Sequence, residues 1–419
     1  MDNADAHAAP PPADYREFSR GWQVVLASFL GIGLGLSPMP FYTMGVFAPH
    51  LAREFGWSVG QIMGGLSVTT LMILWAAPVV GLLAGRIGVR PVVLGSLVLF
   101  GLAFMALGLS NGSLTQYYVT WAVIASVGSG TLPITWTKAV NDWFDLRKGL
   151  ALGLSLMGTG LFGMLCKPYL AWVIGSFGWR AGYVGLGLLP IVIALPAAYL
   201  LFRDSDTHVD AVVRTTTPGG MSFAEVVRDW RFWLLATAML PISFTLSGPV
   251  PNLEVMLRVG GVAPATILGL TPLIGLSALV GRLVGGWLLD RFWAPGVAFV
   301  ILGLPAVAFW LLTGTSLDYA TAAAAILMIG FALGVEYDVM AYFVARYFGL
   351  RRYATIYGML YVVFAFGSGT SPLVFGWDYD RHGNYHLSLT LAAVALLVAA
   401  GSLMLLGRYR QFADEPIVG

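Results

Sequence analysis

Apolar stretches of about 20 residues recur along almost the whole chain, and they constrain its fold more than any other feature. Each stretch is long enough to cross a hydrocarbon core of about 30 Å as a helix. The composition agrees, because 58% of the 419 residues are hydrophobic and only 11% are charged, whereas soluble domains carry about 25% charged residues. We therefore predict an all-α membrane protein that crosses the bilayer many times.

The apolar runs predict about twelve spans, arranged as two six-helix bundles. We expect residues 1–21 to form a polar cytoplasmic tail, 22–203 the first bundle, 204–220 a cytoplasmic linker, 221–410 the second bundle and 411–419 a cytoplasmic C-terminal tail. The predicted spans begin near Trp22, Gln61, Pro91, Thr115, Gly149, Arg180, Phe232, Ala265, Gly296, Ala320, Tyr353 and Leu387.

Basic residues are distributed unevenly between the two sides of these spans. If the N-terminus is cytoplasmic, only Arg53, Arg180, Arg258 and Arg381 face outward, and the other loop arginines face the cytoplasm. This is the positive-inside pattern of membrane proteins. We therefore expect a multi-pass protein of a bacterial plasma membrane with both termini in the cytoplasm.

Several short sequences occur twice, at a near-constant spacing of about 200 residues. WFDLRK at 143–148 matches YFGLRR at 347–352, and GLLAGRIG from Gly81 matches GWLLDRFW from Gly286. PMPFYTM from Pro38 likewise matches PVPNLEVM from Pro249. The matches indicate that the two bundles are internal repeats, as in many transporters.

The loop sequence 81–90 resembles the motif that follows helix 2 in the major facilitator superfamily, and 286–291 resembles its counterpart after helix 8. Gly85 stands where that family usually has an aspartate. The resemblance implies two six-helix bundles that rock around a site in mid-membrane. It also implies conformational roles for Arg86, Arg90, Asp290 and Arg291.

A narrower resemblance covers the start of the fifth span. Residues 144–153, followed by Gly158 and Gly163, are similar to the signature of the monocarboxylate transporters and the oxalate:formate exchanger. Arg282 lies where these proteins tend to carry a substrate-linked arginine. The chain departs from vertebrate members at Ala278, where they carry an aspartate, and it lacks the exchanger's lysine in the eleventh span. The resemblance implies an organic anion as substrate.

Charged residues inside a span cost about 2.5–3.5 kcal/mol each at the bilayer centre, so they are expected to pair or to line a wet cavity. Three cations and two acids fall in this class, and the surplus of positive charge favours an anionic substrate. The residues are Lys138, Lys167, Arg282, Glu336 and Asp338.

Helical rise places Arg282, Asp338 and Glu336 near mid-membrane, about 12–15 Å from the predicted cytoplasmic ends of their helices. The same arithmetic places Lys167 in the outer half, about 27 Å beyond Gly149. In the superfamily the eighth and tenth helices are neighbours. The resemblance therefore lets Arg282 meet one of the two acids, and Lys167 join it in gripping an anion.

Glu336 and Asp338 point about 200° apart, so they cannot share a face of one helix. The matching fourth span carries a polar stripe of Thr131, Thr135, Lys138 and Asp142. If that stripe lines the cavity, its equivalents put Asp338 beside Tyr342 in the cavity and turn Glu336 toward a neighbouring helix. Three alternatives stay open: both acids are structural, Lys167 reaches to the membrane surface, and Lys138 pairs with Asp142.

Pro38-x-Pro40 and Pro249-x-Pro251 are expected to interrupt the first and seventh spans at matching positions. Broken helices commonly line transport paths, so Tyr42 and Asn252 are candidate substrate contacts. The equal alternative is a simple kink near the outer surface. Aromatic residues near the same path, including Tyr342 and Tyr361, would accept an aromatic acid as readily as a small aliphatic one.

The sequence excludes several classes of function. It has no nucleotide loop of the GxxxxGK[ST] type, no histidine deep in a span, and no paired nucleophile and base. We expect neither an enzyme nor a cofactor, metal, nucleic-acid or obligate protein partner.

The predicted function is secondary transport of an organic anion, above all a monocarboxylate, by proton symport. Asp338 or Glu336 would accept the proton, and Arg282, Lys167, Tyr42, Asn252, Tyr342 and Tyr361 would contact the substrate. The alternatives are anion exchange without proton movement and, less favoured, a membrane sensor with a transporter fold.

Overall fold

The computed structural model describes residues 16–144, 148–203, 216–217, 219–314, 316–349, 351–410, 412 and 415–416. Nearly all of them are helical. The predicted linker 204–220 and the two tails lie largely outside this set, so their predicted bounds stay predictions.

The helices before the linker form the N-terminal group. They are α1 (Arg16–Gly33), α2 (Pro38–Phe55), α3 (Val59–Ile87), α4 (Val89–Ala106), η1 (Leu107–Leu109), α5 (Leu114–Gly128), η2 (Ser129–Thr131), α6 (Pro133–Trp143), α7 (Lys148–Phe177), α8 (Trp179–Leu189), η3 (Pro190–Ala194) and α9 (Leu195–Leu201).

The helices after the linker form the C-terminal group. They are α10 (Phe223–Arg228), α11 (Trp230–Ser247), α12 (Pro249–Val259), α13 (Pro264–Leu270), α14 (Leu273–Arg291), α15 (Ala294–Gly303), α16 (Pro305–Leu312), α17 (Tyr319–Phe348), α18 (Tyr353–His382), α19 (His386–Ser402) and η4 (Leu403–Leu406). Two short strands, β1 (Thr216–Thr217) and β2 (Glu415–Pro416), pair antiparallel.

The expected all-α membrane fold is confirmed. Within the described residues ten helical stretches are long and apolar enough to cross a membrane, and α11 with α12, bent by 44°, makes an eleventh. The pair α5 and α6, which η2 interrupts, occupies the remaining predicted position. Each predicted span after the first begins within two residues of the first residue of a helix. The helix of the first span, α1, starts at Arg16, six residues before the predicted Trp22.

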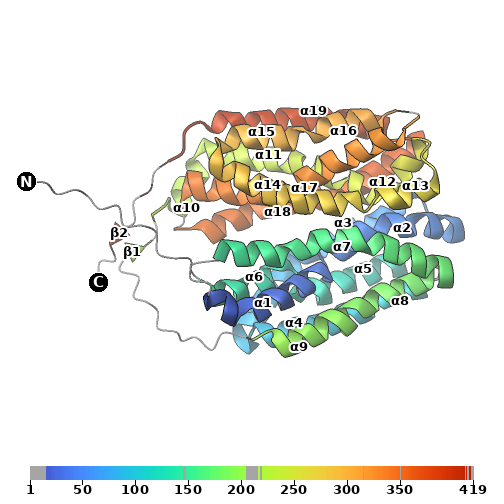
Figure 1. Cartoon of the computed structure of the whole chain (residues 1–419), viewed down its shortest axis with the longest axis horizontal. Coiled ribbons are helices and arrows are strands. Elements are labelled where there is room, and N and C mark those ends of the chain that lie inside the picture. The colour runs from blue at the N-terminus through green and yellow to red at the C-terminus, as the bar shows by residue number, and fades with distance from the viewer. Residues whose placement is uncertain are drawn as a thin grey trace, which may run out of the picture.

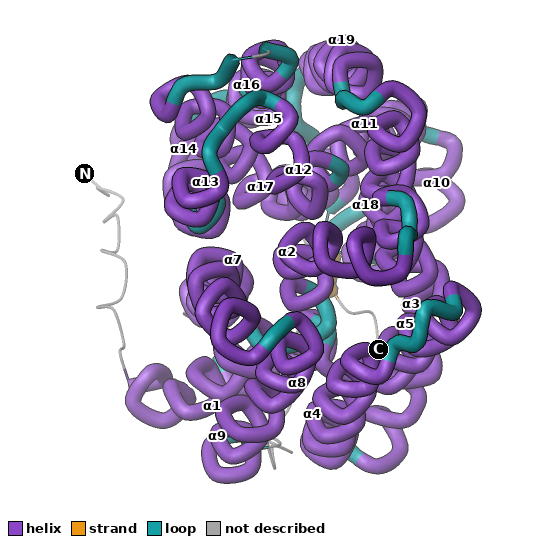
Figure 2. The backbone as a smooth tube through the Cα atoms, turned by 90° about the vertical axis from the view of Figure 1, so that its right-hand side faces the viewer, coloured by secondary structure: helices purple, strands orange, loops and turns teal. Residues whose placement is uncertain are grey.

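The two groups lie side by side with their helices roughly parallel to one long axis (Figure 1). We call the end that carries α10, β1 and β2 the linker end and the opposite end the far end. Figure 2 views the molecule from the far end and shows the two groups one above the other. Helix α2 of the N-terminal group faces α12 and α18 of the C-terminal group where the groups meet. Large apolar side chains cover the outer faces, as expected for contact with lipid; Trp75, Ile134 and Trp310 are each more than 70% exposed.

Three helix pairs make most of the contact between the groups: α2 with α12, α3 with α18, and α7 with α14. Glycine lets the backbones meet in the middle and far parts of these pairs. A Cβ at Gly376 would lie 3.0 Å from the backbone of Gly60, and one at Gly160 would lie 3.1 Å from the carbonyl oxygen of Gly275. A Cβ at Gly45 would overlap Glu254 and the carbonyl of Pro251.

The linker-end parts of the same helices are not held together in this way. Gly81 of α3, Gly153 of α7, Gly286 of α14 and Gly358 of α18 have no atom within 4 Å of a Cβ position.

Two sets of hydrogen bonds also join the groups at the far end. The Asp380 carboxylate accepts hydrogen bonds from the backbone N–H groups of Val59 (2.8 Å) and Gly60 (2.7 Å), and Ser67 donates to the carbonyl of Gly369 (2.8 Å).

Side-chain N-caps stabilise the first turns of several helices. Asp318 accepts a hydrogen bond from the Thr321 N–H (3.0 Å) at the start of α17, and this hydrogen bonding holds the pKa of Asp318 below its usual range. The break between α1 and α2 is stabilised from another helix, because the Leu36 N–H donates to Thr131 Oγ1 (2.9 Å). An interrupted span thus keeps its freed backbone group satisfied within the protein.

Candidate transport site

Arg282 of α14 and Asp338 of α17 meet in the C-terminal group, with Nε 3.7 Å from Oδ2. Small residues bring the two helices together, since a Cβ at Gly334 would overlap the carbonyl of Ala278. The Arg282 Nε also donates weakly to the carbonyl of Gly334 (3.4 Å). The Arg282 Nη1 is buried and has no hydrogen-bond partner in the part of the chain that the structure describes. The guanidinium therefore keeps a donor free beside a loosely held acid.

The two acids of α17 differ in their surroundings. The Asp338 side chain is 32% exposed, whereas Glu336 is 3% exposed and its Oε2 has no hydrogen-bond partner among the described residues. The charge that acts on each of them is that of Arg282. Asp338 is thus the acid in contact with the arginine and with open space, and Glu336 is turned into the protein.

Aromatic rings stand in a row beside this charged group. Tyr353, Tyr357 and Tyr361 follow one another along one face of α18, with ring centroids 5.8 and 6.4 Å apart, and Phe364 continues the row at 6.3 Å. Tyr337 of α17 lies 4.5 Å from Phe364 and 6.3 Å from Tyr361, centroid to centroid. We call Tyr353, Tyr357, Tyr361 and Phe364 the aromatic row.

Lys167 of α7 has an acidic partner that the sequence argument did not anticipate. Its Nζ lies 2.6 Å from Oε1 of Glu254 in α12, and the side chains are 1% and 10% exposed. The distance is that of an ion pair, but the angles are not those of a hydrogen bond, and neither Nζ nor the carboxylate oxygens have such a partner in the described residues. This buried pair joins the N-terminal and C-terminal groups at the far end.

Glu254 changes the count of intramembrane charges. It lies in the bent span of α11 and α12, so three cations face three acids rather than two. The expected surplus of positive charge is therefore wrong, and an anionic substrate cannot be argued from that count. The signal was present in the sequence, because Glu254 belongs to the PVPNLEVM stretch that repeats PMPFYTM.

Other expected substrate contacts are placed differently. Asn252 is buried and already bonded: its Nδ2 donates to the carbonyls of Gly248 and Pro372, and its Oδ1 accepts from Tyr385. Tyr42 is buried against Gly163 and lies within electrostatic range of Arg282 and Glu336.

Tyr342 lies beside Tyr409 and under the Arg346 guanidinium near the linker end. Of the proposed substrate residues, Arg282 and Tyr42 therefore lie near the acids. Tyr361 contacts Tyr337, which is next to Glu336 in α17, and Asn252 serves the packing of its own group.

The polar stripe expected on the fourth span does not line a cavity throughout. Thr131 is fully buried and bonds the Leu36 N–H, because η2 breaks this span where α17 runs on without interruption. The side chains of Lys138 and Asp142 lie outside what the structure describes.

Comparison with known proteins identifies the architecture. A family model for the Major Facilitator Superfamily matches residues 30–372. The chain belongs to the Major Facilitator Superfamily.

The superfamily relatives include monocarboxylate transporter 13 of Bos taurus, which is 26% identical over 411 residues and covers 97% of this chain and 93% of its own. Monocarboxylate transporter 11 of Mus musculus is 26% identical over 415 residues, covering 95% and 89%. A solved bacterial homologue of the human lysosomal transporter Spinster, inward-facing and unoccupied, aligns with a TM-score of 0.67 at 18% identity, covering 95% and 98%. That likeness shows the fold alone.

The loop residues that resemble the superfamily motifs lie at the linker end. Arg86, Asp290 and Arg291 are exposed at the ends of α3 and α14. Arg90 donates to the Tyr199 carbonyl (2.6 Å) and lies over the Tyr199 ring, which ties α4 to α9. Their conformational roles stay predictions.

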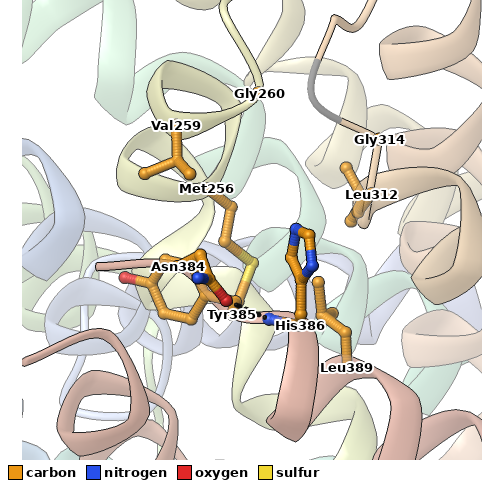
Figure 3. A pocket seen from close by; sticks show the side chains of 9 residues that line it. All are labelled: Met256, Val259, Gly260, Leu312, Gly314, Asn384, Tyr385, His386 and Leu389. Carbon is orange, nitrogen blue, oxygen red and sulfur yellow. Dashed lines mark hydrogen bonds between the residues drawn. The ribbon is translucent and has the colours of Figure 1, made fainter. Parts of the chain in front are cut away.

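A separate cavity of about 150 Å³ opens at the far end of the C-terminal group. Figure 3 shows the side chains that line it, among them Met256, Leu312, Tyr385 and His386. It contains none of the proposed transport residues of this superfamily member. Among the described residues no group of three or more histidines, cysteines or acids could hold a metal ion.

Proposed function

We propose that this protein is a proton-coupled symporter of organic monocarboxylates, with Arg282 as the carboxylate anchor. The observation that carries the proposal is the buried Nη1 of Arg282, which has no hydrogen-bond partner in the described residues while its ion pair to Asp338 is long. A planar guanidinium with a free donor fits a carboxylate through two parallel hydrogen bonds. The monocarboxylate transporters among the relatives support the same class of substrate.

The charges around Arg282 supply a physical reason for proton coupling. When Asp338 and Glu336 are both ionised, the three groups carry a net charge of minus one, which opposes an incoming carboxylate. Each proton taken up by an acid removes one negative charge and favours anion binding. Binding of substrate and binding of protons therefore assist each other by the same factor.

Alternating access would use the ties at the far end. Three kinds of contact hold the far end closed: the Lys167–Glu254 pair, the hydrogen bonds from the start of α3 to the Asp380 carboxylate of α18, and the glycine contacts. The linker-end glycines have open space around them. Release of Lys167 from Glu254 would open the far end. In that state Lys167 could join Arg282 as a second cation for the substrate.

We further propose a bacterial plasma-membrane location with the linker end and both termini in the cytoplasm. The far-end loops and helix ends carry Arg53, Arg180, Arg258 and Arg381, and most other arginines cluster at the linker end. This asymmetry matches the positive-inside rule.

Transport by purified protein in proteoliposomes tests the proposal. We expect uptake of a labelled monocarboxylate to rise when the outside is made acidic, and Arg282→Ala to abolish uptake without loss of folded protein. Counterflow that is insensitive to pH would replace symport by anion exchange. Absence of both uptake and counterflow for every carboxylate would contradict transport and favour a sensor.

A further inference from the structure

The hydroxyl groups of the aromatic row differ from those of the tyrosines that join parts of the fold by hydrogen bonds. Tyr117, Tyr347 and Tyr385 each donate a hydrogen bond that joins two helices or a helix and a loop. In the described part of the chain, the hydroxyls of Tyr353, Tyr357 and Tyr361 make none. Three phenol groups are thus available on one face of α18.

Tyr361, in the middle of the row, keeps exposed surface. It is 36% exposed and lies in α18, and the side chain of Asp338 is 32% exposed and lies in α17. Both therefore keep surface that a small molecule can contact.

The row reaches the charged anchor. Tyr357 lies within electrostatic range of both Asp338 and Arg282, and Tyr337, which contacts Tyr361 and Phe364, lies in range of Arg282 and Glu336. Neighbouring rings of the row are tilted by only 13–22°, so their faces are nearly parallel. Tyr361 is 36% exposed, so a flat ring whose carboxylate is held at Arg282 can stack on it.

We infer that the substrate is an aromatic monocarboxylate whose carboxylate binds Arg282 and whose ring stacks on Tyr361 and Tyr357. The inference rests on the proposed function for the carboxylate end, and it adds the class of the other end. The free phenol hydroxyls donate to or accept from a polar substituent on that ring. A stacked aromatic pair favours an aromatic over a saturated ring by about tenfold in affinity.

Competition against uptake of labelled benzoate in proteoliposomes tests this class. The competitors are benzoate, 4-hydroxybenzoate, cyclohexanecarboxylate and lactate. Cyclohexanecarboxylate matches the charge and size of benzoate but has no π face. We expect benzoate to compete about tenfold better than cyclohexanecarboxylate, and 4-hydroxybenzoate to compete at least as well as benzoate.

Variants separate stacking from hydrogen bonding. Tyr361→Leu should bring benzoate and cyclohexanecarboxylate to parity, and Tyr361→Phe should keep the preference for benzoate but lose any extra gain for 4-hydroxybenzoate. Phe366→Leu, which removes an exposed aromatic on the same helix outside the row, should change neither. The comparison of competitors on the unaltered protein stands even if a variant fails to fold.

The outcomes also separate this inference from the proposed function. Lactate uptake that depends on Arg282, with benzoate no better a competitor than cyclohexanecarboxylate, overturns the aromatic class and leaves carboxylate transport intact. Failure of every carboxylate to be transported, together with no effect of Arg282→Ala on any uptake, overturns both.

Discussion

Lys167 Nζ and Glu254 Oε1 lie 2.6 Å apart across the boundary between the two helix groups, in surroundings that leave their side chains 1% and 10% exposed. Removing one partner of a buried ion pair costs about 3–5 kcal/mol, because the other charge is left buried alone. The closed far end thus depends on both residues being charged and within ion-pair distance of each other. A change that neutralises Glu254 alone, or withdraws Lys167 from it, favours opening.

Glu254→Gln should therefore shift the protein toward a state that is open at the far end. Cys166, the only cysteine of the chain, is 2% exposed next to Lys167 and reports on this opening. We expect its alkylation by a membrane-impermeant maleimide from the far side to rise at least tenfold, which corresponds to about 1.4 kcal/mol. Unchanged alkylation would mean that the pair does not hold the far end closed.

Apolar replacement of both partners gives the opposite outcome. Lys167→Met combined with Glu254→Met leaves no unpaired charge, and such replacements are often neutral or stabilising by about 1–4 kcal/mol. Alkylation of Cys166 should fall to or below the unaltered level, and uptake should be slowed because the far end opens less often. A double variant that behaves like Glu254→Gln would contradict the pairing argument.

Asp380 is a second tie at the far end, since it caps the start of α3 from α18 of the other group. Asp380→Ala removes the acceptor for two N–H groups, and loss of a cap typically costs about 1 kcal/mol. We expect Cys166 alkylation to rise by about fivefold. Asp380→Asn, which keeps an acceptor, should have the smaller effect.

Gly45→Ala should prevent full closure of the far end, because a Cβ there would overlap Glu254 and the Pro251 carbonyl. The matched control is Gly95→Ala, whose Cβ would meet open space in α4, a helix outside the three pairs that make most of the contact between the groups. Uptake should fall strongly in the first variant and stay near normal in the second. Equal activity of the two variants would mean that α2 and α12 need not approach this closely during transport.

Neutralising the acids near Arg282 should flatten the pH dependence of uptake. A process linked to one proton changes up to about tenfold per pH unit, and Asp338→Asn or Glu336→Gln removes one titrating group from the site. Asp318→Asn provides a control, because it neutralises an exposed acid at the N-cap of α17, and asparagine can still cap the helix. Full proton-dependent uptake by both Asp338→Asn and Glu336→Gln would sink the coupling scheme.

The helices were predictable because a membrane span needs only a long apolar run, and that property is local. The break at η2 in the fourth span was not, since Thr131 there accepts a hydrogen bond from the Leu36 N–H in the distant break between α1 and α2. The internal repeat was read as a guide to equivalent faces, yet α17 continues where α5 and α6 are interrupted. Sequence symmetry therefore located the spans better than it located their irregularities.

At the site, too, local properties were predictable and contacts between distant helices were not. Helical geometry says which way a side chain points around its own helix, so the different surroundings of Asp338 and Glu336 could be anticipated. It does not say which helix lies opposite. The pairing of Lys167 with Glu254 arises from the approach of α7 and α12 to α2. Asn252 accepts a hydrogen bond from Tyr385 at the start of α19.

The meeting of Gly60 with Gly376 and of Gly160 with Gly275 has a consequence for what keeps the far end closed. Contacts between backbones bury little side-chain surface, so their separation exposes little apolar area to water, at about 25 cal/mol per Å². An interface of interlocked leucines would resist separation far more strongly. At these glycine contacts the closed far end therefore relies on nearby polar ties, such as the Lys167–Glu254 pair, that a proton can release.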